Sequence, residues 1–144
     1  NMVSAPALAK ERGITVSEVR RASSGAFDSY IRLSVKTERQ QRSVAGTVFS
    51  DGKPRIIQVK GINMEAELAP RVLYVTNLDQ PGFIGALGSV LGEHGINIAS
   101  FNLGREKPGG DAISLVSIDN EASDAVLEEI MALEQVMQVK QLQF

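Results

Sequence analysis

Residues 71–77 form an apolar run, and residues 82–94 repeat apolar positions at spacings of three and four. The run predicts a strand, and the repeat predicts an amphipathic helix. Gly95 follows the helical pattern, where glycine commonly ends a helix in the left-handed conformation. A second strand is predicted over 97–105, where apolar and polar residues alternate and every second side chain from Ile98 onward falls on one side.

The pattern continues with a loop and a further strand, helix and strand. The loop over 106–110 contains one proline and two glycines, which predicts a hairpin leading to a third strand over 112–118. Ser123 is predicted to cap a helix over 123–134, and a last strand covers 136–144. This order, β-α-β-β-α-β, predicts a ferredoxin-like unit and an α+β fold class.

Residues 1–69 follow a different pattern, made mostly of short alternating stretches after a short helix predicted over 6–10. The predicted strands cover 14–20, 30–36, 44–49, 55–59 and 64–68. An Asp-Gly pair at 51–52 is a strong turn signal between two of them. Pro70 marks the joint, without a Gly/Ser linker. We therefore expect a small mixed α/β domain over 1–69, closely coupled to a second domain over 70–144.

The junction between the strand and the helix that open the second domain carries the sequence Asn-Leu-Asp-Gln-Pro-Gly-Phe at 77–83. Pro81 suits a first helical turn, and Asp79 or Asn77 is predicted to cap the free N–H groups there. Free amides at a helix N-terminus attract a carboxylate, and the oxygens of Asp79 and Asn77 accept from an ammonium group. Such a pocket suits the zwitterion of an amino acid. The alternative is that these residues only cap the helix and shape the turn.

These motifs are similar to those of a known family. The Asp-x-Pro-Gly turn at 79–82 and the Gly-x-Asn-Ile stretch at 95–98 resemble the ACT domain, a small regulatory module of amino-acid-sensing enzymes. More specifically, they resemble the C-terminal end of the D-3-phosphoglycerate dehydrogenases. Residues 3–9 and 55–61 resemble the intervening "allosteric substrate binding" domain of the longer members. The resemblance covers nearly the whole chain.

The resemblance implies an L-serine site between the ACT domains of two subunits in a homodimer or homotetramer. The ligand carboxylate would meet the amides around Gly82, and the ammonium would meet Asp79, with Asn97 of the other subunit opposite. Some members carry His or Tyr where Asn77 stands, so we expect less from that position. The predicted serine-binding residues are Asn77, Asp79, Pro81, Gly82, Phe83, Asn97 and Ile98.

The resemblance also implies a basic site for a phosphorylated anion in the first domain. Arg55 stands at one position of that basic cluster, but Ile62 and Glu67 stand where cations would be wanted. We therefore expect phosphate binding to be weak or absent. The only candidates are Lys53, Arg55 and Lys60.

The glycines at 82, 85, 88 and 92 fall three or four residues apart, on one face of the predicted helix. Their spacing is wrong for a dinucleotide fingerprint or a P-loop. They predict close packing against the sheet or against a twin helix.

Composition narrows the possible functions. A net charge of −2 and a pI near 5.5 argue against nucleic-acid and membrane-surface binding. No apolar run reaches the roughly 18 residues of a spanning helix, and zero cysteines exclude disulfides and zinc–thiolate sites. The single histidine, His94, has no suitable neighbours for a catalytic triad, and no acidic or histidine cluster has metal spacing. We expect no catalytic residue and no metal here.

Because the chain starts at Asn1 and not at a methionine, we expect it to be a fragment of a longer, cytoplasmic protein. No Rossmann segment is present, so NAD would belong to the missing part of the implied parent, and no cofactor is expected in this fragment. The leading hypothesis is allosteric feedback control of a dehydrogenase of L-serine biosynthesis. The alternatives are a ligand-free oligomerisation module and the regulatory region of another enzyme, such as an L-serine dehydratase. We also expect the strand over 97–105 to pair with its copy, which would extend the sheet to eight strands.

Overall fold

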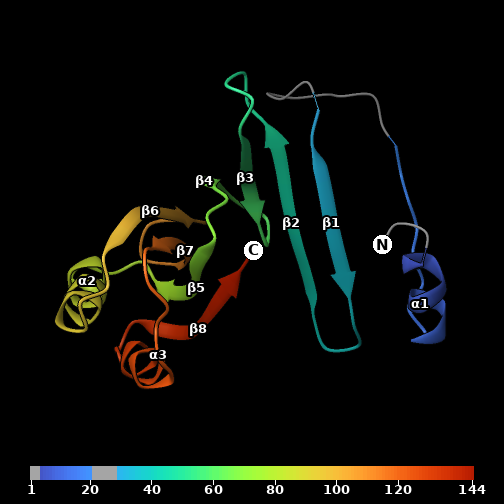
Figure 1. The fold of residues 1–144 in the computed structure, drawn as a ribbon. Helices are drawn as coiled ribbons and strands as arrows, with labels where there is room; N and C mark the ends of the chain where they lie inside the picture. Colours follow the sequence, from blue (N-terminus) through green and yellow to red (C-terminus); the bar gives the residue numbers. More distant parts are fainter. Residues whose placement is uncertain (1–3, 21–28) are drawn as a thin grey trace.

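The computed structural model describes residues 4–20 and 29–144, which form two antiparallel sheets and three helices (Figure 1). The first sheet has four strands in the order β1-β2-β3-β4, and helix α1 precedes it. The bounds are α1 (Ala5–Glu11), β1 (Ile31–Lys36), β2 (Gln41–Val48), β3 (Pro54–Val59) and β4 (Ile62–Glu67). Each strand pairs antiparallel with the next, because short turns join them.

The second sheet has the strand order β6-β7-β5-β8, with all pairs antiparallel. Its elements are β5 (Arg71–Leu78), α2 (Phe83–Glu93), β6 (Ile98–Arg105), β7 (Asp111–Ile118), α3 (Asp124–Met131) and β8 (Val136–Gln143). This order of elements is the predicted β-α-β-β-α-β. The predicted α+β fold class with a ferredoxin-like second half is therefore confirmed.

Helices α2 and α3 cover one face of the second sheet (Figure 1). The main core lies between these two helices and the sheet. Leu87 and Leu91 of α2 and Ile130 of α3 are fully buried with Leu73 and Val116 of the sheet. Burying a side chain of this size contributes about 1.5–3 kcal/mol, so this layer supplies most of the hydrophobic stabilisation of the second half.

The first sheet covers the opposite face of the second sheet. Met64 and Ala66 of β4 are buried with Val72, Ile113 and Leu115 of the second sheet in a separate apolar cluster. The molecule thus has three layers: the first sheet, the second sheet and the helix pair. The second sheet is the middle layer.

Gly104 of β6 lies where β4 packs against the second sheet. A Cβ atom at this position would lie 2.6 Å from the carbonyl oxygen of Asn63 and 2.9 Å from Cγ2 of Ile62. Only glycine allows the two backbones to approach this closely. The close contact accords with the expected close coupling of the two halves, whose boundary at residues 69/70 stays a prediction.

Three turn predictions are confirmed. Gly95 has a positive φ of 67° at the end of α2, and Gly52 has a positive φ of 77° in the turn between β2 and β3. Ser123 caps α3, because its Oγ accepts a hydrogen bond from the backbone N–H of Val126 at 3.4 Å.

The predicted strand over 14–20 is wrong. These residues belong to no strand, and Ile14, Val16 and Val19 are exposed. Alternation alone does not make a strand, because the backbone also needs a neighbour to pair with, and no described strand pairs with this segment. The helix predicted over 123–134 is also shorter than expected, since it ends at Met131.

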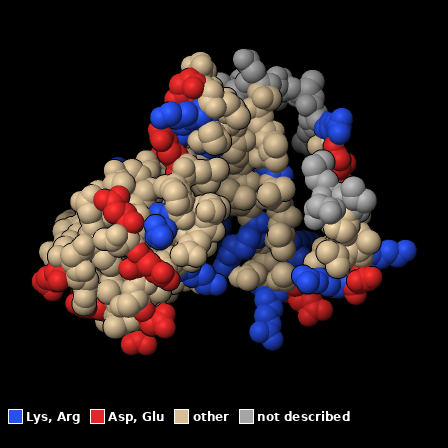
Figure 2. Space-filling view, viewed as in Figure 1, with Lys and Arg blue, Asp and Glu red and all other residues tan. Residues whose placement is uncertain are grey.

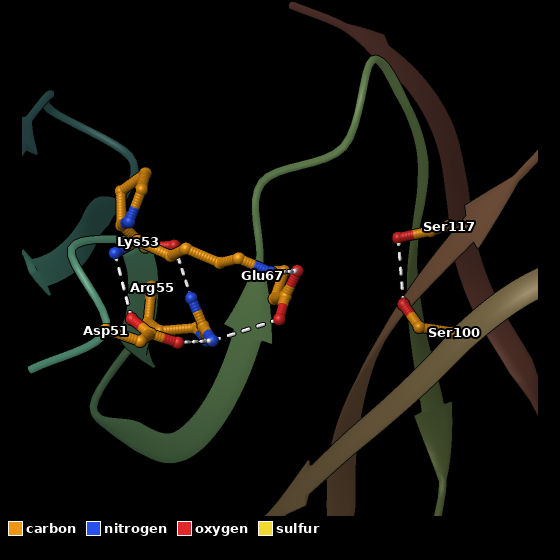
Figure 3. A network of polar contacts seen from close by, with 7 residues as sticks. Asp51, Lys53, Arg55, Glu67, Ser100 and Ser117 are labelled. Atoms are coloured by element: carbon orange, nitrogen blue, oxygen red, sulfur yellow. Dashed lines mark hydrogen bonds and ion pairs between the residues drawn. The ribbon is translucent and has the colours of Figure 1, made fainter. Parts of the chain in front are cut away.

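Strand β6 contains a bulge between Ile98 and Ser100. Ile98 pairs with Ile118 and packs against the helix-covered core. Ser100 pairs with Ser117, and its hydroxyl donates to the Ser117 hydroxyl at 2.9 Å (Figure 3). Because neighbouring residues of β7 point to opposite faces, the prediction that Ile98 and Ser100 share a side is wrong.

The glycines of α2 do not pack against the described part of the sheet, so that alternative is wrong, and packing against a twin helix stays a prediction. A Cβ atom at Gly85, Gly88 or Gly92 would meet no described atom within 4 Å outside the helix backbone and chain neighbours. Buried apolar side chains of α2, such as Leu87 and Leu91, pack in the core cluster with the sheet.

Candidate functional site

Asp79 lies directly after β5, in the turn that leads to α2. Its Oδ2 accepts a hydrogen bond from Arg105 Nη1 at 2.7 Å and another from the backbone N–H of Gly109 at 3.2 Å. The Asp79 side chain is 19% exposed. The Arg105 hydrogen bond and then the Gly109 N–H lower the pKa of Asp79 below its ordinary value, so the carboxylate is charged at neutral pH.

The capping prediction for this turn is wrong. The N-cap of α2 is Gly82, with φ of 91°, and the helix has no side-chain cap hydrogen bond among the described residues. Asp79 is instead held by Arg105 and Gly109 on the neighbouring β6–β7 hairpin. Within the described part of the chain, the first amides of α2, such as that of Ile84, therefore have no side-chain cap.

Asn77 is fully buried within β5. Its side-chain N–H donates to the carbonyl of Leu78 at 2.9 Å, and its oxygen accepts from the Ser114 hydroxyl at 3.2 Å. A ligand outside the chain does not reach a side chain that is buried in this way. Asn77 therefore supports the strand end next to Asp79.

The other predicted residues of the turn contribute in different ways. The side chain of Phe83 is buried in the helix-covered core, so only its backbone faces the turn. Pro81 and Gly82 are exposed at the surface. Their exposure leaves the start of α2 open to solvent.

Asn97 lies at the opposite end of the second sheet from Asp79. The strand register shows this. Ala112, at the start of β7, pairs with both Asn77 and Arg105, so the end of β5 and the end of β6 lie at the same end of the sheet. Ile98, at the start of β6, pairs with Ile118 at the other end. Asn97 and Asp79 of one chain therefore do not meet. Asn97 is engaged there by Asp119, whose Oδ2 accepts from the Asn97 side-chain N–H at 2.7 Å.

The predicted basic cluster is split. Arg55 and Lys53 lie together, but Arg55 Nη2 is 2.9 Å from Asp51 Oδ2 and 2.9 Å from Glu67 Oε1, and Lys53 Nζ is 4.0 Å from Glu67 (Figure 3). The Arg55 side chain is only 13% exposed. Lys60 lies apart, at the other end of the β3–β4 hairpin.

Two carboxylates thus balance the two cations of this cluster. An incoming phosphate would have to displace Asp51 or Glu67 from Arg55. This arrangement supports the expectation that phosphate binding at Arg55 is weak or absent, which stays a prediction.

Sequence reasoning missed Arg105 and Asp119, the partners of Asp79 and Asn97. Both pairs join residues more than 20 positions apart, and only the strand register brings them together. Within residues 4–20 and 29–144, no cluster of acidic or histidine side chains is arranged to hold a metal ion. None of the described helices is long and apolar enough to cross a membrane.

Comparison with known proteins agrees with this architecture. Residues 1–60 match the D-3-phosphoglycerate dehydrogenase intervening domain, and residues 71–135 match the ACT domain. The D-3-phosphoglycerate dehydrogenases of Bacillus subtilis, Synechocystis sp. and Archaeoglobus fulgidus are 33%, 36% and 34% identical to this chain over 140, 130 and 141 residues. The matches cover 97%, 90% and 95% of this chain but 27%, 24% and 26% of the relatives.

The chain therefore spans about a quarter of the length of these relatives. The match falls in their C-terminal region, with β1 to β3 in the part that matches the intervening domain and β5 to α3 in the part that matches the ACT domain. The chain thus contains an intervening domain of the D-3-phosphoglycerate dehydrogenase type followed by an ACT domain, and it is similar to the C-terminal regulatory region of these relatives.

Proposed function

We propose that the ACT half binds a small zwitterionic amino acid, L-serine, between two copies of the chain, and that this binding regulates an attached cytoplasmic D-3-phosphoglycerate dehydrogenase. One observation carries the proposal. Asp79 and Asn97 lie beyond opposite ends of the second sheet, whose outer strand is β6. Asn97 directly precedes the start of β6, and Asp79 lies at the end of the sheet where β6 ends.

If the β6 edges of two copies pair, these two separated residues come together in one site. No described strand pairs with the outer edge of β6, and β6 has no proline and no charge before Arg105. If two copies of β6 pair antiparallel, the start of one strand lies beside the end of the other. Asn97 of one copy then lies near Asp79 of its partner, and the same contact occurs twice by symmetry.

Each pole of an amino acid finds a complementary group at such an interface. The charged Asp79 carboxylate accepts from the ammonium, and the free amides at the start of α2, at Ile84 and Gly85, donate to the carboxylate. Asn97 supplies an amide for a polar side chain such as that of serine. Asn77, which is buried, holds the strand end behind Asp79.

Binding across an interface gives the sensor an output. A ligand that contacts both copies stabilises the dimer by mass action, and the dimer fixes the angle between the two subunits. The close contact of β4 with Gly104 on β6 carries this restraint from the ACT sheet to the intervening sheet. Catalytic domains attached beyond the intervening sheet would then be restrained in their relative orientation when the ligand is bound.

Calorimetric titration of the 144-residue chain with L-serine tests the proposal. We expect a Kd between about 1 μM and 1 mM, with weaker binding of glycine and alanine. Asp79→Ala and Asn97→Ala should each abolish binding while the circular dichroism spectrum stays native. Asn120→Ala is the matched control, because Asn120 is an exposed amide outside the proposed site. Unchanged serine affinity in both test variants would place the ligand elsewhere.

One observation favours a ligand-free oligomerisation module as the second candidate. The Asp79 carboxylate already accepts from Arg105 and Gly109, so it is satisfied without a ligand. Sedimentation analysis separates the two functions. A dimer whose dissociation constant is the same with and without serine supports the structural role, and a serine-tightened dimer supports the sensor.

A further inference from the structure

Arg105 adds a positive charge beside Asp79, at the proposed amino-acid site. It is the last residue of β6, the outer strand of the ACT sheet. Its side chain crosses the end of β7 to reach Asp79, because β7 lies between β6 and β5 in the strand order. Nη1 of Arg105 donates to Oδ2 of Asp79 at 2.7 Å. In the proposed dimer, the Arg105 side chain therefore lies between Asp79 and the strand edge where the partner docks.

The Asp79 carboxylate is held so that one oxygen is used and the other is open. Oδ2 accepts from Arg105 and, at 3.2 Å, from the backbone N–H of Gly109. The backbone N–H of Asp79 donates to the carbonyl of Gly110 at 2.9 Å, which fixes the residue further. Oδ1 accepts no hydrogen bond from the described residues, and it is not buried among them, so it is open to solvent. A ligand ammonium would therefore meet Asp79 at Oδ1.

The Arg105 guanidinium is also only partly used. Its ion pair within the described part of the chain is with Asp79, through Nη1. The Arg105 side chain is 52% exposed, so its other N–H groups, on Nη2 and Nε, can donate to a ligand. Arginine suits a carboxylate, because its planar fork of N–H groups matches the two carboxylate oxygens. The ion pair thus offers one open acceptor and several open donors side by side.

This arrangement distinguishes ligands by their charge. A bare amine that approaches Oδ1 shares one carboxylate with the Arg105 guanidinium, and the two positive charges repel each other. A zwitterion carries a carboxylate next to its ammonium, and this carboxylate accepts from Arg105. The added attraction offsets the repulsion, so the ion pair favours a ligand with both charges.

The remaining charges of the ACT half do not provide this discrimination. Residues 70–144 contain ten Asp or Glu and four Lys or Arg. Figure 2 shows acidic side chains spread over the half that carries helices α2 and α3 in Figure 1. Such a surface attracts any small amine. A cation within the site itself is needed to make binding depend on the ligand's carboxylate.

We propose that Arg105 is the specificity-determining residue that restricts the site to zwitterionic amino acids and rejects amines without a carboxylate. This inference rests on the proposed function, because it concerns the same site. The ligand lies antiparallel to the Asp79–Arg105 ion pair, with its ammonium at Oδ1 of Asp79. Its carboxylate is shared between Arg105 and the first amides of α2.

Calorimetric titration of the 144-residue chain with L-serine and with ethanolamine tests the proposal. Ethanolamine has the ammonium and the hydroxyl of serine but no carboxylate. The original chain should bind L-serine about 100-fold more tightly than ethanolamine, or better, the loss expected from two charge-assisted contacts. In Arg105→Gln this preference should fall about tenfold or more. Ethanolamine then meets no competing cation, and serine loses one contact.

Two further variants separate the charge of Arg105 from a structural role. Arg105→Lys keeps the positive charge, so it should keep most of the preference for serine. Arg32→Gln is the matched control, because Arg32 is an exposed arginine outside the site that donates to the Gln58 side chain at 2.9 Å. It should leave the preference unchanged. A merely structural role of Arg105 would alter both affinities alike and would not move their ratio.

The outcomes separate this inference from the proposed function. If the original chain binds L-serine but the preference is unchanged in Arg105→Gln, the inference is overturned and the proposed function stands. An equal fall in Arg32→Gln would also overturn the inference, since the effect would not belong to the site. If the original chain binds no L-serine, the proposed function fails and this inference fails with it.

Discussion

The two sheets of this chain have the same strand number and the same antiparallel pairing but very different surroundings. The ACT sheet is the middle layer, with helices on one face and the intervening sheet on the other. Among the described residues, the apolar cluster that covers the intervening sheet lies where β3 and β4 meet the ACT sheet. Strand β1 is exposed along its whole length, and Leu33 is 65% exposed.

The difference shows which half of the molecule is stable by itself. An antiparallel sheet needs one face packed on apolar groups, and the ACT sheet has this from its own helices. The described part of the intervening sheet buries Ala45, Ile57, Met64 and Ala66, and two of these, Met64 and Ala66, are packed in a cluster with residues of the ACT sheet. We therefore expect the ACT half to fold on its own and the intervening sheet to depend on docking.

Replacement of one buried leucine should show the largest effect. Leu87→Ala removes a side chain of α2 that is fully buried, and we expect a loss of about 3 kcal/mol in the free energy of unfolding. Leu33→Ala on β1 is the matched control, with an expected change within about 0.5 kcal/mol. Urea denaturation followed by circular dichroism measures both. Equal losses in the two variants would contradict the difference between the sheets.

Gly104→Ala should separate the sheets with a smaller effect. The added methyl group would lie 2.6 Å from the Asn63 carbonyl oxygen, and backbone atoms do not give way as flexible side chains do. We expect a loss of about 1 to 3 kcal/mol, with faster amide hydrogen exchange in β3 and β4 than in β7.

Gly88→Ala is the matched control for this substitution. A methyl group there meets no described atom within 4 Å outside the helix backbone and chain neighbours, and alanine favours a helix, so we expect a gain of roughly 0.5 to 1 kcal/mol. Unchanged exchange in β3 and β4 of Gly104→Ala would mean that the contact with β6 does not hold the intervening sheet.

The ACT half was more predictable from sequence than the intervening half. Glycine and proline stand at the ends of its helices and strands. Its regularly spaced apolar residues lie in elements that bury them, as in α2. In the intervening half, the alternation over 14–20 matched no strand, because pairing depends on a neighbour that local pattern does not reveal. The strand expected over 44–49 begins earlier, at Gln41, where the side chains are polar and exposed.

The candidate site could be predicted only in part. Sequence patterns placed Asp79 between a strand and a helix, as observed. They did not show that Arg105 would hold its carboxylate, because that contact depends on how β6 aligns with β7 and β5. The bulge before Ser100 adds one residue to β6 and reverses the side that the preceding residue faces, which no alternation pattern indicated.

The smallest expected effect is on the pH dependence of stability, for which one aspartate from each half is compared. The pKa of Asp79 is lowered first by the Arg105 hydrogen bond, and the pKa of Asp51 is lowered first by the backbone N–H of Lys53. A lowered folded-state pKa means that each carboxylate stabilises the fold above its ordinary value of 3.8, and that this contribution is lost as pH falls through the lower folded value. Arg105→Gln should therefore raise the pKa of Asp79 toward its ordinary value and leave that of Asp51 unchanged. The stability difference between this variant and the original chain should disappear as the pH falls below the folded pKa. Carboxyl NMR titration of both aspartates measures the shifts, and an Asp79 midpoint that does not move in Arg105→Gln would show that the 2.7 Å contact does not control this carboxylate.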